Sequence, residues 1–160
     1  MTSCSGIRHG CVFALVTALS LSLAAPATAA LRLASRDYGV TQRFAPGGEG
    51  GWDYLTVDTA ARRLYVSRST RVQVLDADTG ALIGEIAHTP GVHGIALAPE
   101  LHRGFTSNGR DSTVTVFDTR TLATLATLHL QGANPDEIIF DPASHRIFVF
   151  NARSHYATVI

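Results

Sequence analysis

Short runs of alternating hydrophobic and polar residues occupy residues 55–160, and turn-forming residues separate these runs. Val72–Asp76 and Val114–Asp118 are typical, because β-branched side chains dominate both. An alternation with a period of two predicts strands with one buried face. A sustained period of 3.6 residues does not occur after the first 30 residues. The sequence therefore predicts an all-β fold with very little helix.

The same pattern recurs with a period of about 40 residues. Aligning Leu55 with Ile95 and Ile138 brings three stretches into register: LTVDTAARRLYVSRS, IALAPELHRGFTSNG and IIFDPASHRIFVFNA. Aromatic residues share one structural position of this repeat, and a polar or basic residue follows three places later. These two sets are Tyr65, Phe105 and Phe148, and Arg68, Asn108 and Asn151. The first two repeats then continue into two further strand-like stretches, and the third is cut off within the first of them, so we expect four short strands per complete repeat.

Turn residues stand at the places where tight connections between these strands are needed. Asp58, Pro99 and Asp141 begin the connection between the first and second strands of their repeats, and Asp76 and Asp118 begin the connection between the third and fourth. Asp and Pro favour turns, the first through side-chain hydrogen bonds to the backbone and the second through its fixed φ. We therefore assign Asp76 and Asp118 structural roles in the repeat.

These motifs resemble the YVTN-repeat, or YncE-like, bacterial β-propellers, which have seven blades. The resemblance covers about residues 50–160. The family has Tyr-Val-Thr-Asn where this chain has Leu64-Tyr65-Val66-Ser67, Gly104-Phe105-Thr106-Ser107-Asn108 and Ile147-Phe148-Val149-Phe150-Asn151. The resemblance implies β-propeller blades of four antiparallel strands each. Such a repeat is specific for architecture and not for activity, since propellers support binding, scaffolding and catalysis.

The first 30 residues are predicted to be an export signal. A short polar start with Arg8 precedes an apolar run from Cys11 to Ala25, and the small residues of Ala27–Ala30 offer a cleavage site. The apolar run is too short for a typical membrane-spanning helix, so no membrane span is expected after cleavage. The sequence therefore predicts an exported protein, periplasmic if the source is Gram-negative.

The rest of the chain is predicted to hold an incomplete set of blades. Residues 31–50 form an N-terminal strand and a glycine-rich loop, in which Val40–Phe44 matches the outer strand of later repeats and would complete the closing blade. The repeats occupy 51–91, 92–133 and 134–160, the last of them truncated. A seven-bladed ring needs about 280 residues, so we expect an N-terminal fragment of about two and a half blades. Its unpaired sheet edges should favour association with other chains.

Composition narrows the classes of function. Both cysteines, Cys4 and Cys11, lie in the predicted signal, so the exported protein has no thiol for a disulfide, a nucleophile or a metal site. The 13 basic residues are all arginines and balance 13 acidic residues. A formal net charge of zero gives no overall positive field, so we expect no nucleic-acid partner.

One position of the repeat carries the candidate chemistry. Asp53, His93 and Asp136 align two residues before the leading apolar residue of each first strand, and we name this the mouth position. The innermost strands of a propeller line its channel, and ligands usually bind at the channel mouth. Two carboxylates and an imidazole suit a divalent cation or an acid–base pair. The alternative is that these side chains cap turns or hydrogen-bond neighbouring loops.

The neighbours of the mouth position leave similar alternatives open. Trp52 and Tyr54 flank Asp53, so either ring could stack on a ligand, whereas a propeller tryptophan also commonly fills space between blades. Asn108 and Asn151 end their second strands, where we expect them to satisfy backbone groups of the turns. The first repeat has Arg68 at this place, so its turn is expected to differ.

Several familiar motifs are absent or wrongly spaced. Asp76–Gly80 begins like a calcium loop, but its glycine comes one residue early and Ala87 stands at the twelfth place. The loop Gly47–Gly51 lacks the Lys-Ser/Thr of a phosphate-binding loop, and no Gly-x-Ser-x-Gly or His-Glu-x-x-His occurs. Five histidines show no paired ligand spacing and are expected at the surface: His88, His102, His129, His145 and His155.

Two functions compete on this sequence. The first is a non-catalytic exported propeller that binds an unknown protein or small molecule over its channel mouth. The second is a metal-dependent hydrolase of the lactonase type, with Asp53, His93 and Asp136 in the metal shell. The second needs further metal ligands from other blades, so the sequence favours the binding protein over the enzyme.

Overall fold

The computed structural model describes residues 38–160, and the predicted export signal lies outside this part. The strands all belong to one compact unit, Val40–Ile160. Eleven strands and one short 3-10 helix, η1 (Pro99–Leu101), make up its regular structure. The prediction of an all-β fold with very little helix is confirmed.

The strands form three separate antiparallel sheets, each a simple meander. Blade 1 contains β1 (Leu55–Asp58), β2 (Arg63–Ser67), β3 (Val72–Asp76) and β4 (Leu82–Ile86). Blade 2 contains β5 (Val92–Ala98), β6 (Arg103–Asn108), β7 (Thr113–Asp118) and β8 (Thr124–His129). Blade 3 contains β9 (Pro135–Asp141), β10 (Arg146–Asn151) and β11 (Tyr156–Val159). Each sheet has the strand order that a propeller blade requires.

The strand register reproduces the alignment of the repeats. In each blade the aromatic residue of the second strand is directly opposite a valine of the third: Tyr65 and Val74, Phe105 and Val116, Phe148 and Val159. Because side chains alternate between the two faces of a strand, equal register places equivalent residues on the same face of every blade.

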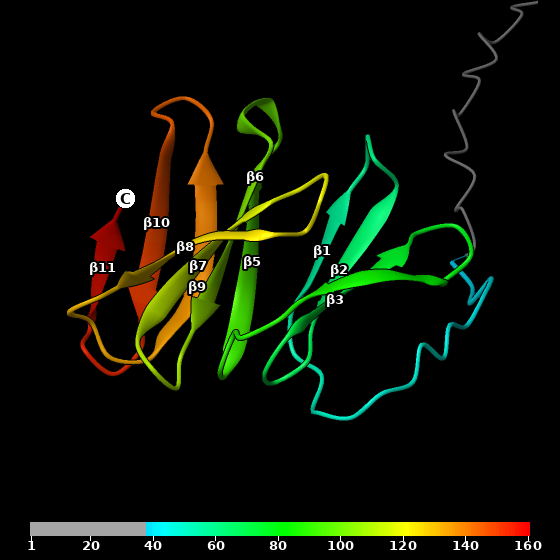
Figure 1. Ribbon diagram of the computed structural model, residues 1–160, viewed down its shortest axis with the longest axis horizontal. Coiled ribbons are helices and arrows are strands. Elements are labelled where there is room, and N and C mark those ends of the chain that lie inside the picture. Colours follow the sequence, from blue (N-terminus) through cyan, green and yellow to red (C-terminus); the bar gives the residue numbers. More distant parts are fainter. Residues whose placement is uncertain (1–37) are drawn as a thin grey trace, which may run out of the picture. The chain divides into compact units, whose positions relative to one another are not determined.

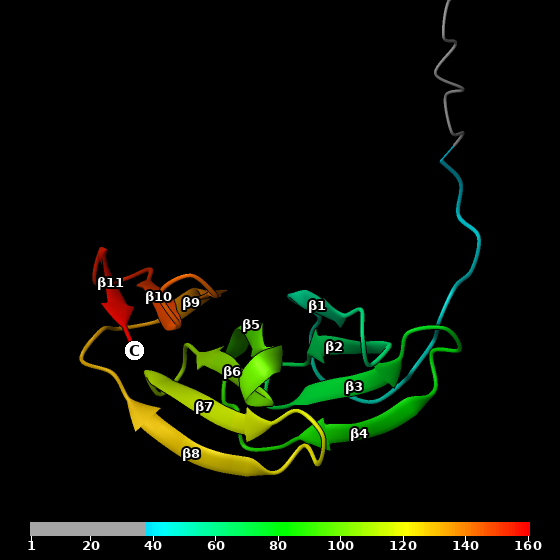
Figure 2. The same cartoon turned by 90° about the horizontal axis from the view of Figure 1, so that it is seen from above.

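The three sheets lie side by side in chain order (Figure 1). Seen from above, β1, β5 and β9 lie on one side of the row, and β4 and β8 lie on the opposite side (Figure 2). The first strand of each blade is therefore the inner strand, as the channel wall of a propeller demands.

Aspartate side chains close the turns that the sequence singled out. Asp76 Oδ1 accepts hydrogen bonds from the backbone N–H groups of Asp78 and Thr79, at 3.1 and 2.8 Å. Asp118 Oδ1 accepts equivalent bonds from Arg120 and Thr121, both at 2.9 Å. These bonds confirm the structural role predicted for Asp76 and Asp118.

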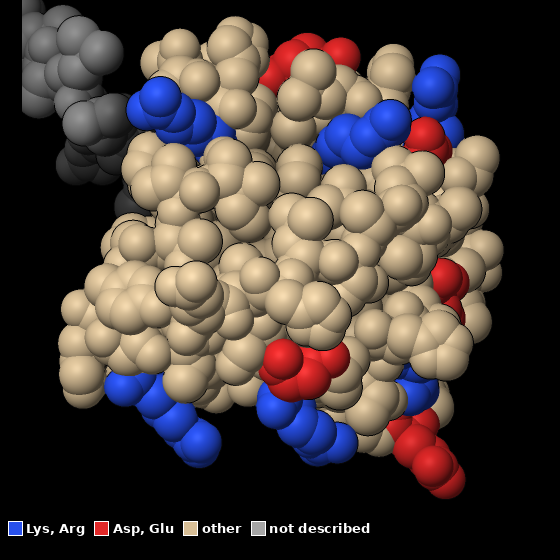
Figure 3. All heavy atoms as spheres, turned by 60° about the vertical axis from the view of Figure 1, so that its left-hand side comes forward, with Lys and Arg blue, Asp and Glu red and all other residues tan. Residues whose placement is uncertain are grey.

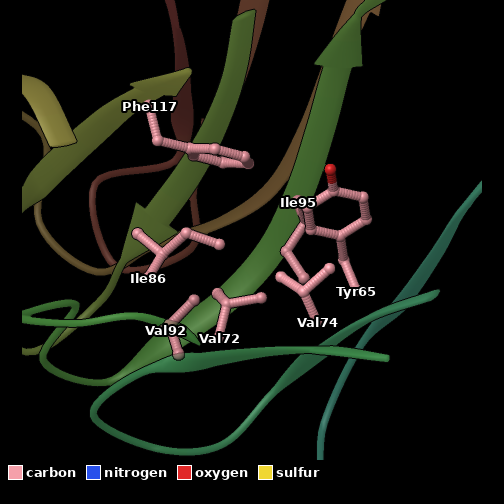
Figure 4. Close-up of a cluster of buried hydrophobic side chains, with 7 residues drawn as sticks. All are labelled: Tyr65, Val72, Val74, Ile86, Val92, Ile95 and Phe117. Carbon is pink, nitrogen blue, oxygen red and sulfur yellow. The ribbon is translucent and has the colours of Figure 1, made fainter. Parts of the chain in front are cut away.

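Two hydrophobic cores lie between neighbouring blades. The first joins blades 1 and 2, and its centre is the contact between the rings of Tyr65 and Phe117, whose centroids are 5.8 Å apart (Figure 4). The second joins blades 2 and 3 around Phe105, Ile138 and Ile147. Burying a side chain of this size contributes about 1.5–3 kcal/mol, so packing between blades is a principal source of stability.

The segment Val40–Phe44, which is predicted to complete the closing blade, has no strand partner within residues 38–160. Residues 38–48 have no regular secondary structure, and none of the described strands pairs with them. A strand requires a hydrogen-bonding neighbour. The segment instead places the Phe44 ring against Gly80, so closely that a Cβ atom at Gly80 would collide with the ring. Gly80 has a φ of 74°, so both its backbone and this close contact require glycine.

Candidate functional site

Two of the three residues at the mouth position meet between blades 1 and 2. Asp53 precedes β1, His93 lies in β5, and the distance from His93 Nδ1 to Asp53 Oδ2 is 2.6 Å. Both side chains are partly exposed, at 30% for His93 and 40% for Asp53. An imidazole that donates its Nδ1 proton to a carboxylate keeps Nε2 as an acceptor. In that tautomer Nε2 is the acceptor of the ring, and it lies beside Gly109, where an added Cβ atom would be 2.7 Å from it.

Serine hydroxyls hold the mouth position against the preceding blade. Ser67 Oγ donates to the backbone carbonyl of His93, and Ser107 Oγ donates to the backbone carbonyl of Asp136. The two serines occupy equivalent positions in β2 and β6, so the bond repeats from blade to blade. Phe150 occupies this position in β10 and has no hydroxyl to donate.

Asp136 lies apart from the dyad and next to Tyr54. The carboxylate of Asp136 raises the pKa of the Tyr54 hydroxyl, and burial and the charge of Glu137 add to this shift. These three residues line a cleft of about 530 Å³ beside β10 and β11. Residues 38–160 contain no group of three or more His, Asp or Glu side chains placed to hold a metal ion. The structure thus does not gather Asp53, His93 and Asp136 into one metal shell.

Trp52 presents an exposed ring that Arg68 covers on one face. Trp52 is 59% exposed, and the Arg68 guanidinium carbon lies 3.7 Å from the centroid of its ring. A cation over an indole face is an attractive electrostatic contact. Within residues 38–160 Trp52 does not lie between two blades, and its ring is accessible beside the Asp53–His93 dyad.

Arg68 itself is buried and holds the glycine-rich loop. It donates to the carbonyl oxygens of Gly47 and Gly48 at 2.8 and 2.7 Å, and it also bonds Glu49, Gly50 and the Gln73 side chain. Hydrogen bonds from a charged donor are stronger than neutral ones. The expected departure of the first repeat at this position is confirmed, and its effect is to order the loop that leads to Trp52.

A small cleft connects these groups and is named here the mouth cleft. It has a volume of about 170 Å³ and is lined by Trp52, Asp53, Ser69, His93 and Arg110, among others. Arg110 is exposed and forms no ion pair within residues 38–160. The mouth cleft combines an aromatic face, a free cation and a polar dyad, a combination suited to an anionic group attached to an apolar or planar body.

Asn108 differs from the expectation in its partners, whereas Asn151 does bond a backbone carbonyl at the end of its turn. Asn108 Nδ2 donates to the hydroxyls of Thr113 and Thr115, so it ties β6 to β7 through side chains instead of turn backbone. Asn151 Nδ2 donates to the Tyr156 carbonyl and the Thr158 hydroxyl. The hydroxyls of the third strand lie within reach because that strand pairs directly with the strand that carries the asparagine.

Sequence reasoning missed several contributors to the site. Arg110 has no counterpart in the repeat alignment, so no sequence signal identifies it. The role of Ser67 and Ser107 had a signal, namely their shared repeat position, but their partners lie on the next blade. The expectation for the five remaining histidines is confirmed, because all of them are exposed.

Comparisons with known proteins support the fold alone. No protein-family model matches the sequence, and neither does any curated protein. Among solved structures, the Kuenenia stuttgartiensis hydrazine synthase matches 70% of this chain with 19% identity and a TM-score of 0.59. The WD40 β-propeller domain of Doa1 matches 68% with 15% identity and a TM-score of 0.59. The chain covers 32% and 36% of these two structures, about a third of each.

The sheets and these likenesses together define the class: the chain has a β-propeller fold, present as an open and incomplete ring of blades. Within residues 38–160, no helix has the length and apolar character needed to cross a membrane.

Proposed function

We propose that this chain belongs to an exported, YncE-like β-propeller that binds a ligand or a partner protein over its channel mouth. The resemblance of the repeat and the propeller fold support this function. The observation that carries it is the mouth cleft, where groups from blades 1 and 2 come together. In this proposal the protein binds without catalysing a reaction.

The chemistry of the mouth cleft defines the kind of group that is bound. Arg110 supplies a planar cation that matches a carboxylate in geometry. Trp52 supplies an apolar face, and Arg68 covers the other face of the same ring. Asp53 is already engaged by His93, so it opposes an anion less than a free carboxylate would. The bound group is therefore a carboxylate carried on a planar or apolar body, from a small molecule or from a partner protein.

The first test uses benzoate and benzamide as probes, because they share a ring and differ in charge. Trp52 is the only tryptophan of the chain, so its indole N–H resonance and its fluorescence report on this site alone. We expect benzoate to shift the indole resonance saturably, and benzamide to bind about tenfold more weakly, a difference of about 1.4 kcal/mol.

Two arginine variants identify the cation responsible. Arg110→Ala should abolish the preference for benzoate. Arg120→Ala is the matched control, since Arg120 is also exposed but lies by the cleft at the other end of β1, beside Asp58. It should bind benzoate like the unmodified chain. Equal responses to both probes, or an unchanged preference in Arg110→Ala, would contradict the proposed site.

A further inference from the structure

A second cleft lies between blades 1 and 2, at the strand ends opposite the mouth cleft, and we name it the turn cleft. It has a volume of about 370 Å³, and its lining includes Asp58, Ala60, Arg63, His102 and Arg120. These residues lie in or beside the turns that join β1 to β2, β5 to β6 and β7 to β8. The walls of the turn cleft therefore belong to blades 1 and 2, whose mutual interface is formed wholly within residues 38–160.

Two arginines line the turn cleft, and neither forms an ion pair with a carboxylate within residues 38–160. Arg63 crosses from blade 1 to blade 2, where its Nη1 donates to the backbone carbonyls of Thr119 and Arg120, the second at 3.3 Å. The other guanidinium nitrogens of an arginine carry further N–H donors. The bonds of Arg63 thus fix one cation beside the turn that carries the other.

The acidic residue of the turn cleft is already engaged by its own turn. Asp58 Oδ1 accepts hydrogen bonds from the backbone N–H groups of Ala60 and Ala61, at 3.0 and 2.9 Å. Bonds of this kind stabilise the carboxylate charge locally. Two arginines and one engaged carboxylate leave the turn cleft with an excess of positive charge, which attracts an anion.

The equivalent interface between blades 2 and 3 shows which group is missing from the turn cleft. In the repeat alignment Ala60 corresponds to Glu100, and His102 corresponds to His145. Glu100 Oε1 lies 3.8 Å from His145 Nδ1, so a carboxylate of one blade faces an imidazole of the next. Between blades 1 and 2 the alanine supplies no carboxylate, and the imidazole of His102 lines the turn cleft instead.

The distribution of charge on the surface agrees with a site at the turns. On the face shown in Figure 3, charged side chains gather at the two ends of the strands, and the surface between these ends is mostly uncharged. An anionic ligand therefore finds partners at the turns and not on this blade surface.

We propose that the turn cleft binds the phosphate group of a small molecule, which takes the place that the Glu100 carboxylate has beside His145. Arg63, His102 and Arg120 contact this group. Planar guanidinium groups match the oxygen atoms of a phosphate, and charge-assisted hydrogen bonds are among the strongest in proteins. The volume of the turn cleft is within the range of small-molecule sites. The site is separate from the mouth cleft and goes beyond the proposed function.

The test uses the full chain, with inorganic phosphate as the probe and the backbone amide resonances of Ala61 and Arg120 as reporters. We expect phosphate to shift both resonances saturably, and potassium chloride of the same ionic strength to cause no saturable shift. Binding of benzoate at the mouth cleft is followed at Trp52 instead. Failure of one site is therefore distinguishable from failure of the other.

Substitution of Ala60 tests the role of the missing carboxylate. Ala60→Glu should weaken phosphate binding about tenfold, since an internal carboxylate then competes for the same cations. Ala60→Gln is the matched control, because glutamine has the size of glutamate without its charge, and it should bind phosphate within about twofold of the unmodified chain. Ala60 is exposed, so both variants should fold, which circular dichroism and thermal melting verify.

Three results would overturn the proposal. The first is an unmodified chain in which phosphate shifts the two reporters no more than potassium chloride does. The second is an Ala60→Glu variant that binds phosphate like the unmodified chain. The third is an Ala60→Gln variant that loses as much affinity as Ala60→Glu, because the loss would then come from filled space and not from charge.

Discussion

Blades 1 and 2 differ at the end of their second strands, and the difference separates two structural tasks. Asn108 in blade 2 makes three hydrogen bonds to threonine hydroxyls of its own sheet. Arg68 in blade 1 instead reaches out of its sheet to the carbonyl oxygens of residues 47–50. The asparagine stabilises the blade, whereas the arginine stabilises a loop and the aromatic ring that follows it.

A neighbouring position makes the comparison more informative. Thr106 donates to Asn108 Oδ1 in blade 2, and the equivalent residues in blades 1 and 3 are Val66 and Val149. Within residues 38–160 those two blades each have a buried side-chain atom without a partner at this site, Arg68 Nε and Asn151 Oδ1. Blade 2 is therefore the one in which this polar network is complete.

The largest expected effect is the loss of that complete network. Asn108→Ala removes three hydrogen bonds and leaves the buried hydroxyls of Thr106 and Thr115 without a partner, while Thr113 keeps its bond to Asp111. We expect a loss of about 3 kcal/mol in the free energy of unfolding. Asn151→Ala removes two bonds and one unpaired oxygen, so its loss should be about half as large. Urea denaturation measures both. Equal losses would contradict the difference between the two blades.

Substitution of Arg68 should lower the free energy of unfolding less than Asn108→Ala does, but it should change the hydrogen exchange of the glycine-rich loop. Arg68→Asn gives blade 1 the residue of blade 2 without its threonine partners, and it releases the loop. We expect the free energy of unfolding to fall by about 1–2 kcal/mol. In the unmodified chain the Gly51 amide donates to Ser69 Oγ, and we expect this amide to exchange its hydrogen faster in the variant.

The fluorescence of Trp52 should change with the same substitution, because the cation leaves its ring. Arg62→Asn is the control, since Arg62 lies at the opposite end of β2 from Arg68 and pairs with the exposed Asp78 instead of the loop. It should leave the Gly51 exchange rate and the emission unchanged. An unaltered emission spectrum in Arg68→Asn would show that Arg68 does not order the ring.

The next prediction tests whether Asn151 Oδ1 lacks a partner only because blade 3 has Val149 where blade 2 has Thr106. Val149→Thr gives it the threonine of blade 2, and the new hydroxyl can donate to Asn151 Oδ1. We expect a change below about 0.5 kcal/mol, against a loss of about 1–2 kcal/mol for Val74→Thr, whose hydroxyl enters an apolar core. Thermal melts of the two variants give the comparison, and similar losses would refute this explanation of the unpaired oxygen.

The smallest expected effect is on the pH dependence of stability, and it comes from the equivalent Asp turns that blades 1 and 2 each contain. Hydrogen bonds from Thr79 lower the pKa of Asp76, and those from Thr121 and Arg120 lower the pKa of Asp118. A lowered folded-state pKa contributes stability above the unfolded value of about 3.9. That contribution disappears as the pH falls through the lower folded value.

Acid titration of the melting temperature checks this contribution. Asp118→Asn keeps the turn geometry but has no charge to titrate, so it should lose less stability than the unmodified chain as the pH falls from about 5 to about 2. An identical acid response in both proteins would show that the Asp118 carboxylate does not contribute.

Residue patterns alone determined the blades. The alternation of side chains, the repeat of about 40 residues and the Asp turns depend on contacts within a few residues or between adjacent strands, and all of them are confirmed by the structure. The same local logic predicts a strand at residues 40–44, and this stays a prediction, because a strand needs a partner edge and the described residues 38–160 contain none for it.

Only the tertiary structure decided how the candidate site is composed. The mouth position aligned three residues, yet Asp53 meets His93 while Asp136 lies beside Tyr54. Equivalent residues on successive blades contact each other only when their side chains are long enough to span the distance between the two blades. Arg110 and the loop contacts of Arg68 join segments that no repeat relates, so packing in three dimensions, not sequence pattern, brought them together.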